Sequence, residues 1–489
     1  MNRARPTRHV LRAACTLAAA ALACAAAAPA HADAPTGVTE RVTVGTPGSQ
    51  PDGASNAQGL SADGRFAVFT SSASNLLPGS GNGRTKVFVR DLWTGKVERE
   101  DVGTAGADAD LDSYEATISG NGRFVAFTSS ATNLGSGAGR ATPDVYVHDR
   151  LTGRTEPVAA TDPAKPQTGH SAGTPSISWD GRYVAFQSDR TDLAPAGITP
   201  HGGTIYVTDR RTGKTRLVSI GADGTAANGS SASPVISADG RTVGFISKAT
   251  NLIAQDKPGA FPEDAFGDLT TADDLAPGSS STSTGSGTGT STGTGTGTSS
   301  PRILKPRSYP FYVRDLDDEE TRLASPDGKG GSRGVENPSL SPDGRFAVFS
   351  APVFHGTGPW DRHFEVFVRD LEQGTERSVT VALPGTTVRS DAWEGRMTAD
   401  DRWVYFSSTA DDLVPGDTNN ASDVFRFDLW SNRTERVSVA TDGSQSTGGS
   451  SAPFVDAFGT TVLFTSEDGT LVPDDSNKLP DVFVHRYRF

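Results

Sequence analysis

The sequence predicts an all-β protein, and three observations lead to that prediction. Seven stretches share one pattern, a short apolar segment, a tight Asp-Gly turn and a second apolar segment, seen most clearly at Leu340–Phe349. Their turn positions follow one another at steps of 58, 59, 59, 104, 57 and 58 residues. Each period holds four strand candidates. Repeats of this length bury their faces against their neighbours, and four strands per repeat arranged radially form a β-propeller, here with seven blades.

The turn pattern marks the first hairpin of every repeat, because Asp-Gly between apolar runs is the strongest short-range hairpin signal. The seven copies are Leu60–Phe69, Ile118–Phe127, Ile177–Phe186, Ile236–Phe245, Leu340–Phe349, Met397–Phe406 and Val455–Phe464. In the second repeat the predicted strands are Ala116–Ser119, Phe124–Thr128, Asp144–His148 and Thr155–Ala159. The second of these has no polar alternation, so both of its faces should be buried.

Residues 1–32 have the pattern of a secretion signal. Four arginines form its charged end, Ala13–Ala28 is its apolar core, and Ala30-His31-Ala32 is a small-x-small cleavage site. The core is too short and too rich in alanine for a good membrane span, so none is expected. Lipidation of Cys24 is the other interpretation, but Leu22 stands one residue too close to the cysteine.

The remaining chain is acidic and free of cysteine, since Cys15 and Cys24 both lie in the signal segment. Neither disulfides nor thiol chemistry is therefore expected. Without the four arginines of that segment, the chain has 41 basic and 58 acidic residues, a net charge of −17. This balance argues against nucleic acid and anionic membranes as partners.

The N-terminal strand is predicted to complete the last blade. Thr39–Val44 matches Thr434–Val439, which is the fourth strand of the sixth repeat. Asp481–His485 is a third strand, and no fourth strand follows it before Phe489. Pairing of Thr39–Val44 with this third strand closes the ring and removes an open sheet edge. The propeller domain is thus predicted to span residues 33–489.

The one long step reflects an insertion in the fourth blade, at 254–307. It begins with an acidic piece and continues as Gly, Ser and Thr from Gly278 to Ser300. This composition cannot bury apolar surface, so a disordered loop is expected. Loops tolerate extra length at little cost, which favours an idle insertion over a functional lid.

The repeats resemble the WD40-like β-propeller (PD40) repeat. The residues that carry the resemblance are Ser-Pro-Asp-Gly-Arg at 341–345, Val-Phe-Val-Arg-Asp at 87–91 and 366–370, and a Thr-Gly turn at 94–95. The seventh repeat departs from it, with Phe458-Gly459-Thr460. This repeat occurs in the propeller of periplasmic TolB and in many secreted bacterial proteins, and the resemblance leaves protein binding by the propeller open. The resemblance covers about residues 37 to 489.

No counterpart of the α/β domain of TolB precedes it here, which argues against a TolB-like role in translocation. The same repeat also precedes hydrolase domains of the prolyl-oligopeptidase type, and no such domain follows.

A nucleophile-elbow match is present at Gly169-His170-Ser171-Ala172-Gly173. That motif needs a strand, a sharp turn and a helix. Here it falls in a loop between predicted strands, so a catalytic serine is not expected.

Two loops carry oxygen ligands at positions 1, 3 and 7, a spacing that suits calcium. The residues are Asp417, Asn419 and Asp423, and one repeat later Asp475, Asn477 and Asp481. The EF-hand pattern is not met, and Asx turns that lead into the next strand are the other interpretation. Calcium is the one cofactor that the sequence suggests. Histidine is too scattered for a zinc cluster.

The start of each first strand should lie at the mouth of the propeller channel. The candidate binding residues there are Glu115, Thr174, Ser233, Asn337 and Glu394, with Ala57 and Ala452 in the first and seventh repeats. Glu115 and Glu394 lie in the second and sixth blades, across the ring from each other. Glycoside hydrolysis needs two carboxyl groups within about 10 Å, and opposite walls of a seven-bladed channel are expected to be farther apart. A solvated polar channel is therefore favoured over this pair as a catalytic site.

Arg and Asp recur at fixed places and are predicted to pair within each blade. The arginines open the second strands and the aspartates close the third strands: Arg65, Arg123, Arg182, Arg241, Arg345 and Arg402 with Asp91, Asp149, Asp209, Asp315, Asp370 and Asp428. Second and third strands are antiparallel neighbours, so these ends meet. In the seventh repeat Thr460 and Arg486 replace both partners. Turn capping by each Asp is the alternative.

These observations predict a non-enzymatic binding scaffold for a protein, a peptide or an envelope component. The alternative is a hydrolase or lyase that uses carboxylates at the channel mouth. The protein is expected to be a monomer, secreted to the extracellular space or the cell envelope.

Overall fold

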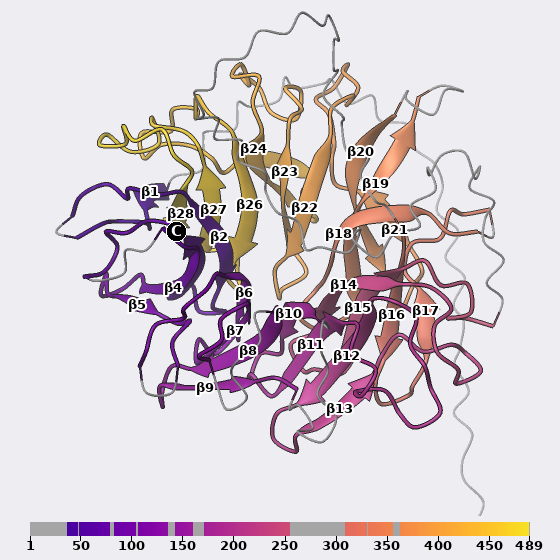
Figure 1. The fold of residues 1–489 in the computed structure, drawn as a ribbon. Coiled ribbons are helices and arrows are strands. Elements are labelled where there is room, and N and C mark those ends of the chain that lie inside the picture. Colours follow the sequence, from indigo (N-terminus) through magenta and orange to yellow (C-terminus); the bar gives the residue numbers. More distant parts are fainter. Residues whose placement is uncertain are drawn as a thin grey trace, which may run out of the picture. The chain divides into compact units, whose positions relative to one another are not determined.

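The computed structural model describes residues 37–46, 48–78, 83–103, 106–134, 142–159, 171–254, 309–329, 331–355 and 362–488. Every regular element in this part of the chain is a β-strand, so the all-β prediction is confirmed (Figure 1). Within the same residues, no helix is long and apolar enough to cross a membrane. The predicted signal segment 1–32 and nearly all of the predicted insertion 254–307 lie outside the described residues.

The first three repeats each form one antiparallel sheet of four strands, in chain order. The strands are β2 (Ser55–Leu60), β3 (Phe66–Ser71), β4 (Lys86–Asp91) and β5 (Val97–Arg99); β6 (Ser113–Ile118), β7 (Phe124–Ser129), β8 (Asp144–Asp149) and β9 (Arg154–Pro157); β10 (Ala172–Ile177), β11 (Tyr183–Ser188), β12 (Thr204–Asp209) and β13 (Lys214–Leu217). Strand β6 starts earlier than predicted, because an irregular register carries its pairing past Glu115 to Ser113.

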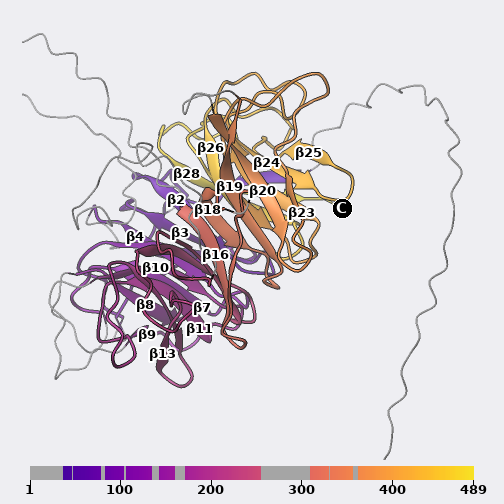
Figure 2. The same cartoon turned by 90° about the vertical axis from the view of Figure 1, so that its right-hand side faces the viewer.

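The fourth and fifth repeats share one sheet, because the start of β16 pairs with the start of β18. The strands are β14 (Ser231–Ile236), β15 (Thr242–Ser247), β16 (Tyr309–Asp315) and β17 (Thr321–Leu323), then β18 (Gly334–Leu340), β19 (Phe346–Phe354), β20 (Arg362–Asp370) and β21 (Glu376–Ser378). Strands β19 and β20 have nine residues each and pair over their whole length. Figure 2 shows β18, β19 and β20 side by side.

The sixth repeat forms its own sheet, and the seventh is completed from the other end of the chain. The strands are β22 (Ala392–Met397), β23 (Trp403–Ser408), β24 (Asp423–Asp428) and β25 (Arg433–Arg436), then β26 (Ser450–Val455), β27 (Thr461–Ser466), β28 (Asp481–Tyr487) and β1 (Gly37–Arg41). Strand β1 pairs with β28, with Thr39 opposite His485. The predicted pairing of Thr39–Val44 with the last strand is thus found, although the regular strand ends at Arg41.

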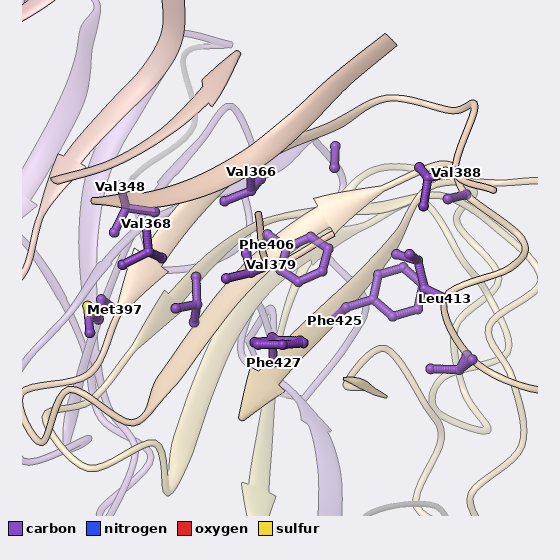
Figure 3. Packing of buried hydrophobic residues seen from close by; sticks show 14 residues of the cluster. Val348, Val366, Val368, Val379, Val388, Met397, Phe406, Leu413, Phe425 and Phe427 are labelled. Carbon is purple, nitrogen blue, oxygen red and sulfur yellow. The ribbon is translucent and has the colours of Figure 1, made fainter. Parts of the chain in front are cut away.

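The core consists of apolar layers between successive sheets. The second strands are buried on both faces, as their pattern predicts, and Ala67, Val68 and Phe69 have no exposed area. Figure 3 shows the layer between the fifth and sixth repeats, where valines of β19 and β20 meet Met397 and Phe406. A fully buried side chain of this size contributes about 1.5–3 kcal/mol, so these layers hold neighbouring sheets together.

The Asp-Gly turns also contact the preceding repeat. Gly181 has a φ of 75°, a left-handed conformation that favours glycine. A Cβ atom at this position would lie 2.1 Å from Cδ2 of Phe124 in the repeat before. The turn therefore needs glycine for two reasons, its backbone angle and the close ring.

The predicted Arg–Asp pairs are hydrogen-bonded in five of the six repeats that carry them. Arg123 donates to Asp149 through Nε at 2.8 Å and Nη2 at 2.7 Å, and this bond lowers the pKa of Asp149 to about 2. The four other bonded pairs are Arg65–Asp91, Arg182–Asp209, Arg345–Asp370 and Arg402–Asp428. Arg241 departs, because its Nε lies 3.0 Å from Asp317. Asp149 also accepts from the backbone N–H of Leu151, so pairing and turn capping coexist.

The first strands of successive repeats contact one another in sequence order. Strand β2 contacts β6, and the contacts continue through β10, β14, β18, β22 and β26. Strand β26 in turn contacts β2. The starts of these strands lie together at the end where the second strand passes into the third, which is called the loop face below.

Candidate functional site

The residues predicted at the channel mouth share one backbone conformation, found at a β-bulge in each of their first strands. The register between first and second strand slips there. The φ angles are 51° at Glu115, 50° at Thr174, 52° at Ser233, 47° at Asn337 and 62° at Glu394, with 55° at Ala452 in the seventh repeat. A left-handed backbone costs a non-glycine residue about 1–2 kcal/mol, so the surrounding fold holds this position. In the first repeat the irregularity falls between Ala57 and Gly59.

Glu115 and Glu394 each bridge two neighbouring repeats through one carboxylate oxygen. Glu115 Oε2 accepts from Thr128 Oγ1 at 2.9 Å and from the backbone N–H of Thr174 at 2.7 Å. Glu394 Oε2 accepts from Ser407 Oγ at 2.9 Å and from the backbone N–H of Ala452 at 2.7 Å. Burial raises the pKa of Glu115. The bulge in the following repeat leaves one backbone N–H group without a partner in its sheet, and each carboxylate accepts a hydrogen bond from that group.

The other three predicted residues differ in exposure. Asn337 is exposed, whereas Thr174 and Ser233 are half-buried. Among the described residues, Thr174 Oγ1 has no hydrogen-bond partner although it is buried. Binding of a ligand by these five residues stays a prediction.

The fifth repeat carries a partly buried carboxyl group beside its bulge. Glu336 precedes Asn337 in β18, and its Oε1 is buried without a hydrogen-bond partner in the described part of the chain. Burial raises the pKa of Glu336 to about 6, Arg362 lowers it, and Asp391 raises it further. A carboxyl group that titrates near neutral pH is a candidate general acid or base.

The comparison between repeats explains why Glu336 is unsatisfied. Its cross-strand neighbour is Ser350, in the place held by Thr128 and Ser407 in the second and sixth repeats. There the bulge glutamate accepts from that hydroxyl group. In the fifth repeat the bulge residue is Asn337, and Ser350 Oγ is buried with no partner among the described residues. Two polar groups therefore lie side by side with unused hydrogen-bonding capacity.

Charges on two other elements act on Glu336. Strand β18 carries it, Arg362 opens β20, and Asp391 precedes β22. Asp391 Oδ1 accepts from the backbone N–H of Phe364 at 2.8 Å, which ties β20 to the sixth repeat. The guanidinium of Arg362 lies 5.6 Å from the ring of Phe364. Glu336, Asn337, Arg362 and Asp391 are called the β18 cluster below.

The sequence reasoning missed Glu336, although a signal was present. At the same position the second and sixth repeats have Tyr114 and Trp393, whose cross-strand partners correspond. A glutamate in a place that aromatic residues occupy elsewhere departs from the pattern. The bulge position that the repeats share is the next residue along the strand, so a comparison of bulge residues does not include Glu336.

The two predicted calcium loops each enclose an arginine. In the first loop, Arg436 Nη2 lies 3.7 Å from Asp417 Oδ2, and Arg436 Nε lies 3.9 Å from Asp423 Oδ2. Asn419 Oδ1 accepts from the backbone N–H of Ala421, as an Asx turn does. Burial raises the pKa of Asp423 to about 6.

The second loop repeats this arrangement with a residue from the opposite end of the chain. Arg41 Nη1 lies 3.6 Å from Asp475 Oδ1. Asp481 accepts from Thr43 Oγ1 at 2.6 Å and from Asn477 Nδ2 at 3.1 Å, and burial raises its pKa to about 6. Among the described residues, no group of three or more His, Cys, Asp or Glu side chains could hold a metal ion. In both loops the carboxylate oxygens thus lie beside a guanidinium, and the calcium binding suggested by the sequence is untested.

The nucleophile-elbow match lies partly outside the described residues, which begin again at Ser171. The backbone N–H of Ser171 donates to Asp189 Oδ1 at 2.7 Å. Strand β10 follows directly, where the motif needs a helix. Ser171 therefore lacks the strand, turn and helix that position the nucleophilic serine in this motif.

Comparison with known proteins gives similarities of fold only. No protein-family model matches the sequence, and no curated protein matches it. Among solved structures, oligogalacturonate lyase from Vibrio parahaemolyticus is 13% identical, with 94% of this chain and 98% of that chain covered and a TM-score of 0.47. TolB from Acinetobacter baumannii is 12% identical, with 83% and 76% covered and a TM-score of 0.36. Acylaminoacyl peptidase from Pyrococcus horikoshii is 10% identical, with 87% and 51% covered and a TM-score of 0.45.

These structures correct one expectation. The sequence predicted a non-enzymatic scaffold for a protein, peptide or envelope component, yet a lyase and a peptidase stand beside TolB among the similar structures. That prediction is therefore withdrawn.

Proposed function

We propose that residues 33–489 form a closed seven-bladed β-propeller of the WD40-like type. The contacts that run from β2 through successive first strands to β26 and back to β2 support closure. The pairing of β1 with β28 supports completion of the last blade by the N-terminal strand. Export to the cell envelope or beyond, with residues 1–32 as the signal, rests on the sequence pattern of that segment.

We further propose that the protein is a hydrolase or lyase whose chemistry takes place at the β18 cluster. The observation that carries this proposal is Glu336, a carboxyl group with a pKa of about 6 and an unsatisfied buried oxygen. Holding such a group costs stability, because its charged form is desolvated without a compensating hydrogen bond. Perturbed carboxyl groups of this kind concentrate at catalytic sites.

Each neighbour of Glu336 has a role that its chemistry allows. As a base, Glu336 takes a proton from the substrate or from water; as an acid, it returns one to the leaving group. Arg362 supplies the positive charge that offsets negative charge as it develops on the substrate. The amide of the exposed Asn337 can both donate to and accept from a substrate. A substrate with an anionic group fits the β18 cluster best, because Arg362 is the positively charged residue of the cluster.

Activity screening with a matched pair of variants tests the proposal. Purified protein is incubated with acidic polysaccharides, neutral polysaccharides and peptides, and both new reducing ends and unsaturated products are measured. Glu336→Gln is expected to abolish the activity found and to leave the fold intact. Glu372→Gln, at an exposed turn residue 3.8 Å from Arg345, should leave it unchanged. If both variants retain the activity, the β18 cluster is not the site.

The pH profile assigns the role of Glu336. A base must be ionised, so the rate would rise through about pH 6. An acid must be protonated, so the rate would fall above about the same pH. A profile that is flat across this range would remove Glu336 from the mechanism.

A further inference from the structure

The β19–β20 hairpin carries a second group of polar side chains, on the face opposite Glu336. Residues two apart on a strand share a face, so Glu336, paired with Ser350, faces the sixth repeat with Val348 and Val366. His363 and Glu365 lie on the other face, two residues apart on β20. His355 directly follows β19 and is exposed.

These side chains form one continuous chain of hydrogen bonds from buried to exposed positions. Ser378 Oγ, at the end of β21, donates to Glu365 Oε2 at 2.6 Å. Glu365 Oε1 lies 2.9 Å from His363 Nε2, and His363 Nδ1 lies 2.6 Å from His355 Nε2. His363 is only 1% exposed, and its ring lies nearly parallel to that of His355, at 7°, with centroids 4.6 Å apart. A buried histidine thus links a carboxylate to a histidine at the surface.

The carboxylate determines where the ring protons lie. A carboxylate only accepts, so His363 must carry its proton on Nε2 and present a lone pair at Nδ1. That lone pair accepts from His355, which must then carry its proton on Nε2. The lone pair of His355 is consequently at Nδ1. A carboxylate that fixes the tautomer of a histidine by this kind of bond is how catalytic and metal-binding histidines are oriented.

We propose that His355 is a proton-accepting, nucleophilic imidazole on the loop face, oriented through His363 by Glu365. When His355 Nδ1 takes a proton from a hydroxyl group or a water molecule, the ring becomes an imidazolium. Its Nε2–H stays hydrogen-bonded to His363 Nδ1, and His363 keeps its own Nε2–H on Glu365. The proton donor becomes its conjugate base. The imidazolium later gives the proton to the product, and this transfer restores the neutral ring. Toward an acyl donor the same lone pair forms an N-acyl bond as the leaving group departs. This site does not depend on the β18 cluster.

Carbethoxylation by diethyl pyrocarbonate measures the reactivity of each histidine without a known substrate. Mass spectrometry of the intact, folded protein after brief exposure gives a rate for each site. His201 is the internal control, because it is also exposed but lies just before β12, in another repeat. We expect His355 to react severalfold faster than His201. Glu365→Gln should lower the rate at His355 to that of His201 and leave His201 unchanged.

Nitrogen NMR of the ring atoms gives an independent readout in the unmodified protein. The Nε2–H tautomer is expected for both His355 and His363, and Glu365→Gln should let His363 exchange between tautomers. Two results would overturn the proposal. One is a rate at His355 equal to that at His201 in the native protein. The other is a rate at His355, or a tautomer of His363, that Glu365→Gln leaves unchanged. The comparison with His201 needs no variant, so it decides the matter even if Glu365→Gln unfolds the hairpin.

Discussion

Replacement of Thr43 by Val tests whether the N-terminal strand holds the seventh repeat as firmly as a strand within a continuous repeat. Thr43 Oγ1 donates to Asp481 Oδ1 at 2.6 Å and accepts from the backbone N–H of Val482 at 3.2 Å, in a fully buried position. The sixth repeat contains the matched control. There Ser438 Oγ donates to Asp423 Oδ1 at 2.5 Å and accepts from the backbone N–H of Val424 at 3.1 Å.

The expected cost follows from these two bonds. A hydrogen bond to a charged group contributes about 1.5–3 kcal/mol, and a buried N–H left unpaired costs about 1–3 kcal/mol. Valine keeps the shape of threonine, so no cavity term is added. Thr43→Val should therefore reduce the free energy of unfolding by about 2–5 kcal/mol, and Ser438→Ala by a similar amount.

Urea unfolding and native-state hydrogen exchange measure the two losses. Every 1.4 kcal/mol is a factor of about ten in an equilibrium constant, so exchange at the Val482 amide should accelerate by about 30-fold or more. A contribution of β1 to stability is refuted if Ser438→Ala shows its full loss while Thr43→Val changes the free energy of unfolding by less than about 0.5 kcal/mol, the usual effect of a surface substitution. That result would mean that β1 lies beside β28 without holding it.

Three further predictions follow from the same structure. Asp423 and Asp481 both have a pKa of about 6 in the folded protein, against an ordinary 3.8. Their contribution to the free energy of unfolding is therefore fully present below pH 3.8 and is lost as the pH rises through about 6. A pH series of urea unfolding should show this loss, and Asp423→Asn should reduce it. Gly181→Ala should lower the melting temperature more than Gly213→Ala, since both glycines have positive φ but only Gly181 faces a ring at 2.1 Å; equal shifts would show that the ring gives way. The melting temperature should be the same in millimolar calcium and in a chelator, because arginines already supply the positive charge in both acidic loops. A rise of the melting temperature with calcium that Asp475→Asn removes would instead support calcium binding there.

The strands were predictable because they recur in every repeat, and the Arg–Asp pairs because both residues recur in six of the seven repeats. The Arg–Asp pairing needed only the antiparallel neighbourhood of second and third strands, and Arg123 with Asp149 follows it. The exception at Arg241 has a local cause. The turn after β16 offers Asp317, which competes for the same guanidinium.

The candidate sites were harder to predict, because their residues come from features that a single repeat does not share with the others. Glu336 depends on Asn337 at the bulge, on Ser350 across the ladder and on charges from β20 and the segment before β22. The histidine chain depends on the extra length of β19 and β20. One signal was available for it, since His363 and Glu365 alternate along a strand and must share a face. Nothing in the repeat pattern indicated that His355 would meet them across the hairpin.

The pairing of β1 with β28 also determines the order in which this chain can assemble. Thr39 and His485 are bonded across 446 positions of sequence, so the last sheet cannot be finished until the far end of the chain is available. Contacts between residues so distant in sequence form slowly, because much of the intervening chain must be ordered first. In that interval β28 presents an unpaired edge, and the β1 segment of any molecule can dock onto it. At high concentration, refolding is thus the stage at which two chains can exchange their N-terminal strands, and dilution favours pairing of β1 with β28 within one chain.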